Sequence, residues 1–194
     1  MLIELKCWLA GSTVVPQVGS SIPLGTWRPA PTEGRNYNVR VRYSKKIRLP
    51  REAYANPDLR FHIVMRTHPE VGNLPTSVRD VIWGSVIEQA SSARIQLLAA
   101  CLMADHLHML AGPGDLDIIA FCDAWKSWST RLAWGAGHRG QLWQPSMYDV
   151  AIRDERQFEN AALYVVDNPV RAGLCRTAAE WPHAWAYWWD TPKL

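Results

Sequence analysis

The fold is indicated most clearly by the stretch Leu102-Met103-Ala104-Asp105-His106-Leu107-His108-Met109-Leu110. Its apolar end, residues 107–111, has the composition of a buried strand, and residues 95–101 just before it predict another. Because alternate side chains of a strand point to the same face, His106 and His108 are expected side by side, with the residue between them in the core. Two imidazoles in this arrangement can hold one metal ion. Pairs at this spacing also arise by chance, so the pair alone does not identify a metal site.

Hydrophobic periodicity predicts further elements on both sides of this stretch. In chain order they are strands at residues 37–43 and 61–66, a helix at 77–91, the two strands just described, a helix at 115–134, a strand at 148–152 and a helix at 155–168 that Asp154 caps. From residue 61 onward, this order fits an α+β fold. The simplest form is a ferredoxin-like antiparallel sheet with helices packed on one face.

The last predicted helix carries a tyrosine and an asparagine on one side. Tyr164 and Asn168 are four residues apart, so they lie one turn above each other. The apolar stripe of this helix consists of Phe158, Ala161, Ala162 and Val165. Tyr164 lies about 110° and Asn168 about 70° from the centre of the stripe, so both are at its flanks. Taken alone, the two residues are better explained by a boundary tyrosine that only packs against the core.

Together, the histidine pair and the tyrosine-asparagine pair could cleave a phosphodiester. Mg²⁺ or Mn²⁺ accepts an amide oxygen, imidazoles and phosphate oxygens, and it keeps open positions for a substrate. Such an ion would disperse the charge of the phosphate in the transition state. A tyrosine hydroxyl has an ordinary pKa of about 10, so it needs a nearby cation or base to attack at neutral pH. A phosphotyrosine link would conserve the energy of the broken bond, whereas hydrolysis would not need the tyrosine.

The composition indicates a folded cytoplasmic protein. The 194 residues are 48% hydrophobic and 20% charged, which suits one domain with a substantial core. No apolar run approaches the roughly 20 residues that cross a bilayer, and the first residues lack the basic start of a signal peptide. The four cysteines include no C-x-x-C pair, which favours reduced core thiols over a structural zinc site.

The net charge of +3 is unevenly distributed. Seven basic residues and no acid lie between Arg35 and Arg51. The candidates for contacts with a DNA backbone in this basic stretch are Arg40, Arg42, Lys45, Lys46 and Arg48. Such a stretch attracts polyanions. The alternative is a solvated edge strand whose charges protect it from aggregation.

Six segments, in the same order along the chain, resemble the HUH-type single-tyrosine transposases and most closely the REP-associated tyrosine transposases. They are Phe61-His62-Ile63-Val64-Met65-Arg66, the stretch at residues 102–110, Leu142-Trp143-Gln144-Pro145-Ser146-Met147-Tyr148-Asp149, Ile152-Arg153-Asp154-Glu155, Tyr164-Val165-Val166-Asp167-Asn168-Pro169-Val170-Arg171-Ala172-Gly173-Leu174 and Glu180-Trp181-Pro182. Each segment is ordinary by itself, whereas the ordered set is specific. The resemblance implies a nuclease domain with the HUH endonuclease fold at residues 45–185, an N-terminal appendage at 1–44 and a tail at 186–194.

The resemblance also implies a function and a site. The chain is expected to be a transposase-like single-strand endonuclease and strand transferase that acts at hairpins of palindromic DNA repeats, as a monomer or homodimer. Tyr164 would form a covalent bond to a 5′ phosphate, and His106, His108 and Asn168 would bind Mg²⁺ or Mn²⁺. Tyr148 is the competing tyrosine, but it is predicted on a strand and lacks an amide one turn later. Further DNA contacts are expected at Lys126, Arg153 and Arg171.

Two departures from the family pattern affect the site. Ala104-Asp105 stands where Pro-Asn is usual, so a carboxylate that could join or disturb the metal site precedes the histidines. Val150 replaces a common histidine. Two other functions compete with the transferase: a hairpin-binding regulator of the same fold without catalysis, and a metal-dependent hydrolase that uses activated water.

Overall fold

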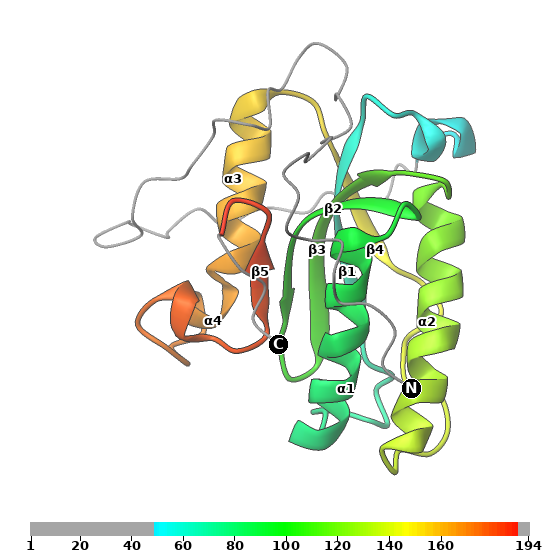
Figure 1. Ribbon diagram of the computed structural model, residues 1–194, viewed down its shortest axis with the longest axis vertical. Coiled ribbons are helices and arrows are strands. Elements are labelled where there is room, and N and C mark those ends of the chain that lie inside the picture. The colour runs from blue at the N-terminus through cyan, green and yellow to red at the C-terminus, as the bar shows by residue number, and fades with distance from the viewer. Residues whose placement is uncertain (1–48, 190–194) are drawn as a thin grey trace, which may run out of the picture.

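The computed structural model describes residues 49–189 and has a five-stranded antiparallel sheet at its centre (Figure 1). The strands are β1 (Arg60–Arg66), β2 (Ile95–Leu102), β3 (His106–Pro113), β4 (Tyr148–Ile152) and β5 (Ala184–Ala186). Their order across the sheet is β4-β1-β3-β2-β5, and every neighbouring pair is antiparallel. The expected α+β fold with an antiparallel sheet is confirmed.

Four helices accompany the sheet within the described residues. They are α1 (Thr76–Ile87), α2 (Ile118–Gly135), α3 (Glu155–Val166) and the single turn α4 (Asn168–Arg171), with short 3₁₀ turns at Arg51–Ala55, Glu88–Ser91 and Ala178–Glu180. Two aspartates cap α2 and α3. The Asp117 carboxylate accepts a hydrogen bond from the amide of Ala120 at 2.7 Å, and Asp154 accepts one from Gln157 at 2.8 Å. Such caps satisfy amides that have no partner inside the helix.

The helices cover both faces of the sheet, which corrects the expectation that they pack on one face. On the first face, α1 and α2 pack against a cluster that includes Ile63 and Met109. On the second face, α3 packs against Leu98 and Leu110. The apolar stripe expected on α3 is buried there, because α1 and α2 already occupy the other face. A bulge in β2 between residues 97 and 99 shifts the alternation of the strand at this point.

One residue of α2 differs from its expected environment. Lys126 was expected to contact DNA, yet only 8% of it is exposed. Its ammonium group donates hydrogen bonds to the carbonyls of Gln144 at 3.3 Å and Pro145 at 2.8 Å. The chain between α2 and β4 passes over α2 at this point, and its carbonyl groups give the buried ammonium polar partners.

The predicted elements from residue 61 onward are present, although α1 ends at Ile87 and α2 begins at Ile118, inside the predicted ranges. Two further features differ from the prediction. The last predicted helix is divided at Asp167 into α3 and α4, so Asn168 begins α4. The structure also contains β5, a strand that was not predicted, which pairs with residues 99–101 of β2. The strand predicted at 37–43 and the basic stretch around it lie outside the described residues. The domain boundaries at 44 and 185 stay predictions.

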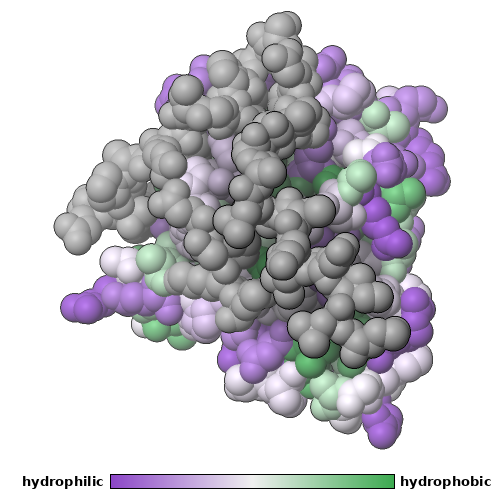
Figure 2. Space-filling model, in the orientation of Figure 1, coloured by the Kyte–Doolittle hydropathy of each residue, from purple (hydrophilic) through white to green (hydrophobic). Residues whose placement is uncertain are grey.

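The surface of the described part is mixed in character. No helix within residues 49–189 is long and apolar enough to cross a membrane. Where described residues are visible in Figure 2, hydrophobic residues form scattered patches among hydrophilic ones. Within residues 49–189, the exposed large hydrophobic residues are Val81, Trp134 and Leu174, which lie in α1, in α2 and after α4.

Candidate active site

The two candidate metal ligands lie at the start of β3, on the face of the sheet that α3 covers. β3 pairs with β1, so His106 is opposite Arg66 and His108 is opposite Val64. The rings of the two histidines are 4.8 Å apart between centroids. The His108 residue is 4% exposed, whereas 18% of the His106 side chain is exposed. Alternation along the strand therefore places both imidazoles on one face, as expected from the sequence.

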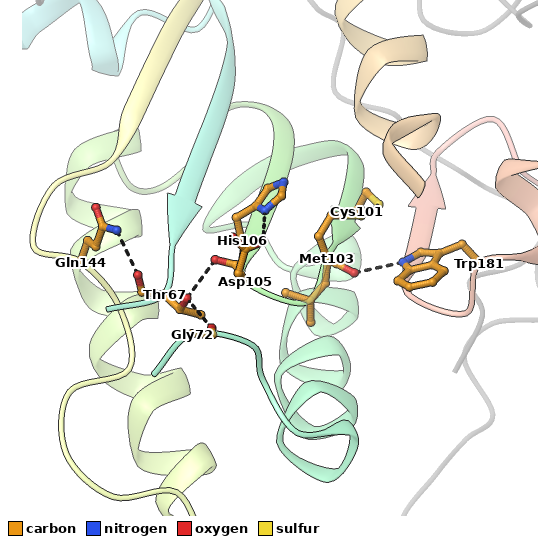
Figure 3. A network of polar contacts seen from close by, with 9 residues as sticks. Thr67, Gly72, Cys101, Met103, Asp105, His106, Gln144 and Trp181 are labelled. Carbon is orange, nitrogen blue, oxygen red and sulfur yellow. Dashed lines mark hydrogen bonds and ion pairs between the residues drawn. The ribbon is translucent and has the colours of Figure 1, made fainter. Parts of the chain in front are cut away.

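The His106 ring is held by the residue before it. Its Nδ1 lies 2.6 Å from Oδ1 of Asp105, in the turn that joins β2 to β3 (Figure 3). Thr67 fixes this turn from the end of β1. Its amide donates to the carbonyl of Asp105 at 2.9 Å, and its single hydroxyl proton is shared between that carbonyl at 3.1 Å and the carbonyl of Gly72 at 2.9 Å. The carboxylate is thus attached to a backbone that is itself hydrogen-bonded.

The His108 ring is held by a third histidine, His62 of β1. Nε2 of His62 lies 3.0 Å from Nδ1 of His108, and the two rings are nearly parallel. Burial lowers the pKa of His62 to about 4. Burial also lowers the pKa of His108 well below its ordinary value, with His62, His106 and Arg66 as smaller causes. Two neutral imidazoles can share one hydrogen bond, whereas two imidazolium rings would repel each other.

Tyr164 reaches this group from α3. Its ring lies 5.6 Å from the ring of His108 and 5.5 Å from that of His62, between centroids, with an edge-to-face geometry in both pairs. On the other side, the guanidinium carbon of Arg171 lies 4.9 Å from the centroid of the Tyr164 ring. A cation at this distance attracts the face of the ring. The tyrosine is therefore held between two buried imidazoles and an arginine.

Asn168 lies one turn beyond the tyrosine, at the first residue of α4. Its Nδ2 donates to the carbonyl of Tyr164 at 2.7 Å and to that of Val165 at 3.3 Å. Because the amide nitrogen is hydrogen-bonded to the helix backbone, Oδ1 is the atom of this side chain that can accept a hydrogen bond or bind a metal ion. The amide of Asn168 thus contacts the backbone of Tyr164, four residues earlier.

The other predicted DNA contacts are in different places. Arg171 is beside Tyr164, as described. Arg153 precedes α3, eleven residues before the tyrosine, which corresponds to about 16 Å along a helix axis. Lys126 is on the opposite face of the sheet. The competing Tyr148 begins β4, where it is paired with Val64. The basic residues between Arg35 and Arg48 lie outside the described part of the chain.

Sequence reasoning gave no role to His62 and only an ambiguous one to Asp105. His62 alternates with apolar residues on β1, which predicts a polar position on one face of the strand. That signal does not reveal the partner, because the pairing of β1 with β3 joins residues 46 positions apart. For Asp105, adjacency to His106 was visible, but the direction of its carboxylate depends on the turn that Thr67 holds.

The donor set suits a divalent ion only if the amide takes part. Among residues 49–189, no group of three His, Cys, Asp or Glu side chains is arranged to hold a metal. The available donors are two imidazoles and the Oδ1 of Asn168, and such N and O donors fit ions that keep open positions for phosphate oxygens. The tether of Asn168 Nδ2 to the helix leaves the oxygen as the donor, which agrees with this fit.

Comparison with known proteins identifies the family. The family model described as "Transposase IS200 like" matches residues 55–168, more than half of the chain. The chain belongs to this transposase family. The match ends at Asn168, so it includes both histidines, the tyrosine and the amide. Membership places the chain among proteins that act on DNA.

The chain is also similar to two known proteins. The REP-associated tyrosine transposase of Escherichia coli (strain K12) is 22% identical over 111 residues, which are 56% of this chain and 65% of the relative. The chain thus matches slightly less than two thirds of that relative's length. A solved structure of a REP-associated tyrosine transposase bound to a REP hairpin has 17% identity and a TM-score of 0.52, covering 64% of this chain and 74% of that chain. This second likeness supports the fold.

Proposed function

We propose that this IS200-like transposase is a metal-dependent single-strand DNA endonuclease and strand transferase with Tyr164 as its nucleophile. The observation that carries the proposal is the contact of the Tyr164 ring with the buried His108 ring, which joins α3 to β3. A tyrosine that only filled the core would not need two imidazoles and an arginine around its ring. Family membership supports the same chemistry.

In the proposed reaction, Oη of Tyr164 attacks the phosphorus of a phosphodiester. A bond forms between Oη and phosphorus, and the bond between phosphorus and the 3′ oxygen breaks. The tyrosine proton goes to solvent or to a nearby base, and the leaving 3′ oxygen takes up a proton. The products are a 5′-phosphotyrosine and a free 3′ hydroxyl. Because the phosphodiester energy is kept in the new bond, a second 3′ hydroxyl can reverse the step and rejoin strands.

The residues of the chain have separate tasks in this reaction. His106, His108 and Asn168 would hold Mg²⁺ or Mn²⁺. When bound, the ion supplies charge stabilisation for the phosphate oxygens. Arg171 packs on the ring of Tyr164 and keeps it beside the histidines. The ring of His62 forms the other side of this tyrosine site.

The proposed substrate is a DNA hairpin with a single-stranded flank. The solved relative bound to a REP hairpin supports this choice. Within this chain, the basic stretch at residues 35–51 supplies charges for the hairpin backbone, and Arg153 and Arg171 supply charges at the two ends of the helical segment that carries the tyrosine. Lys126 is the weakest of the proposed contacts, since its ammonium is hydrogen-bonded to backbone carbonyls.

The proposal is tested with hairpin oligonucleotides that carry randomised single-stranded flanks and a label at the 3′ end. With Mn²⁺, the full chain is expected to give a labelled covalent adduct on a denaturing gel, because the 3′ fragment stays on the tyrosine. Tyr164→Phe removes the nucleophile and should abolish the adduct. Tyr148→Phe is the matched control, since it removes the same hydroxyl from the competing tyrosine, and it should leave the adduct unchanged.

Each other outcome overturns the proposal in a different way. Cleavage that survives Tyr164→Phe would indicate a hydrolase that uses activated water. Hairpin binding without cleavage or adduct would indicate a regulator that has the same fold. An adduct lost in Tyr148→Phe but kept in Tyr164→Phe would assign the nucleophile to β4.

A further inference from the structure

Both candidate metal-binding imidazoles are held at the same ring nitrogen. Nδ1 of His106 lies 2.6 Å from the carboxylate of Asp105, and Nδ1 of His108 lies 3.0 Å from Nε2 of His62. We propose that Asp105 and His62 are positioning residues that fix the tautomers of His106 and His108 and so direct the Nε2 lone pairs of both rings to one ion. This inference rests on the proposed function for the identity of the ion site.

The tautomer of His106 follows from the chemistry of its partner. An ionised carboxylate only accepts hydrogen bonds, so the hydrogen between Oδ1 of Asp105 and the ring must be on Nδ1. A neutral ring with hydrogen on Nδ1 has its lone pair on Nε2. A separation of 2.6 Å also leaves no room for an ion between the two atoms. Nε2 is therefore the atom of His106 that can bind a metal.

The backbone of Asp105 makes this contact well defined. The carbonyl of Asp105 accepts a hydrogen bond from the amide of Thr67, and the carbonyl of the preceding residue, Ala104, accepts one from the amide of Leu74 at 2.7 Å. The amide of Met103 donates to the carbonyl of His106 at 2.8 Å, which closes the turn. The turn in Figure 3 is therefore fixed from two sides, which holds the backbone that carries the carboxylate beside the His106 ring.

The tautomer of His108 is a choice between two arrangements. Either Nδ1 of His108 donates to Nε2 of His62, or the donor and the acceptor are reversed. In the reversed arrangement, the hydrogen of a neutral His108 is on Nε2, which cannot then bind a metal. The first arrangement frees Nε2 of His108 and places the hydrogen of His62 on its own Nδ1. His62 therefore acts as an acceptor in the proposed site.

This arrangement explains why a carboxylate is tolerated where the family usually has asparagine. The side-chain oxygen of asparagine can accept the same hydrogen bond from the following histidine. Asp105 thus acts on the ring of His106 and not as an additional metal ligand. Residues that orient metal-binding histidines in this way commonly change metal affinity by about 10- to 100-fold when they are removed.

The first test reads the tautomers directly in the metal-free protein. Long-range ¹H–¹⁵N correlation spectra of the chain labelled with ¹⁵N-histidine distinguish a protonated from an unprotonated ring nitrogen. The expected result is hydrogen on Nδ1 and none on Nε2 for both His106 and His108, with His62 also protonated on Nδ1. Hydrogen on Nε2 of either candidate ligand would overturn the inference, and this readout requires no variant to fold.

Variants separate the two positioning residues. In Asp105→Ala, only the ring of His106 should become free to adopt either tautomer. Asp105→Asn should restore the tautomer with hydrogen on Nδ1. In His62→Phe, only the ring of His108 should become free to adopt either tautomer. His62→Gln should restore the tautomer with hydrogen on Nδ1, because the side-chain oxygen of glutamine can accept the hydrogen bond. Asp123→Ala is the matched control, because it removes an exposed carboxylate from α2 and should change neither ring.

The second test measures Mn²⁺ binding by electron paramagnetic resonance, without DNA. Asp105→Ala and His62→Phe should each weaken binding by about 10- to 100-fold, whereas Asp105→Asn and His62→Gln should stay close to the wild type. Equal loss in Asp105→Ala and Asp105→Asn would instead make Asp105 a direct ligand and overturn its positioning role. Failure of the adduct assay with correct tautomers would contradict the proposed function only, and an adduct with wrong tautomers would contradict this inference only.

Discussion

Cys122 is one of the buried groups that couple the stability of the protein to alkaline pH. Burial in α2 raises the pKa of its thiol from 9.0 to about 12, with smaller effects from Lys126 and nearby aspartates. In the unfolded chain, the thiol loses its proton above about pH 9, whereas in the folded chain it stays protonated. Stability from this group is therefore fully present below pH 9 and is lost as the pH rises toward 12.

We predict that the free energy of unfolding falls more steeply with rising pH in the wild type than in Cys122→Ala. Between about pH 8 and pH 10, the wild type should lose about 1 kcal/mol more free energy of unfolding than the variant, as measured by urea denaturation. The variant starts from a lower stability because it leaves a small cavity. Parallel losses in the two proteins would mean that the thiol is not protected from ionisation.

Single residues of the site were partly accessible to sequence reasoning. His106 and His108 could be placed together because the alternation of a strand is local, and Tyr164 and Asn168 because the helical turn is local. The role of His62 could not be predicted, since its contact with His108 depends on which strands pair. The direction of the Asp105 side chain depends on hydrogen bonds from a residue 38 positions earlier.

At the scale of elements, the N-terminus of α3 supports the helix that carries the tyrosine. The exposed carboxylate of Asp154 accepts a hydrogen bond from the amide of Gln157 at 2.8 Å. Asp154→Ala leaves that amide without its cap and should lower the free energy of unfolding by about 1 kcal/mol. Asp154→Asn keeps an acceptor at the same place and should restore most of the loss. Equal losses in urea denaturation would assign the effect to the charge of Asp154 and not to the cap.

The elements that sequence reasoning missed share one physical cause. β5 has three residues, and its sequence of alanine and tryptophan has no alternation that marks a strand. It becomes a strand because the edge of β2 offers unpaired backbone groups, and the bonds of β5 satisfy them. The placement of α3 on the second face has a similar origin. Its apolar stripe was evident, but only the complete sheet shows which face remained uncovered.

At the scale of the whole molecule, the main result is a convergence of distant segments on one face of the sheet. β1, β3 and the helical segment after β4 supply His62, His108 and Tyr164, which are separated by up to about half of the chain and meet within ring contact. The βαββαβ core makes this possible, because β1 and β3 are central neighbours in the sheet. The order of elements in the sequence predicts the βαββαβ core. The distances between the rings of His62, His108 and Tyr164 depend on how the strands and α3 pack, which the sequence order does not give.

The positive charge of the whole chain gives the final prediction, which concerns DNA affinity. Each phosphate contact by a lysine or arginine contributes about 0.7 to 0.9 to the slope of log affinity against log salt, because counterions are released. If the basic stretch contacts the hairpin backbone, the triple change of Lys45, Lys46 and Arg48 to Ala should lower this slope by about 2 to 3. Fluorescence anisotropy of a labelled hairpin at several salt concentrations measures it.

The matched control removes positive charge from another part of the molecule. Arg131 and Arg139 are exposed on α2 and in the turn after it, on the side of the sheet away from α3. Their double change to Ala lowers the net charge in the same direction, yet it should leave the slope close to that of the wild type. If both sets of changes reduced the slope in proportion to the charge removed, binding would follow the net charge of the molecule, and the basic stretch would have no specific contact with the hairpin. A reduction confined to residues 45–48 would instead assign the backbone contacts to that stretch, because counterion release counts only charges that lie against phosphates.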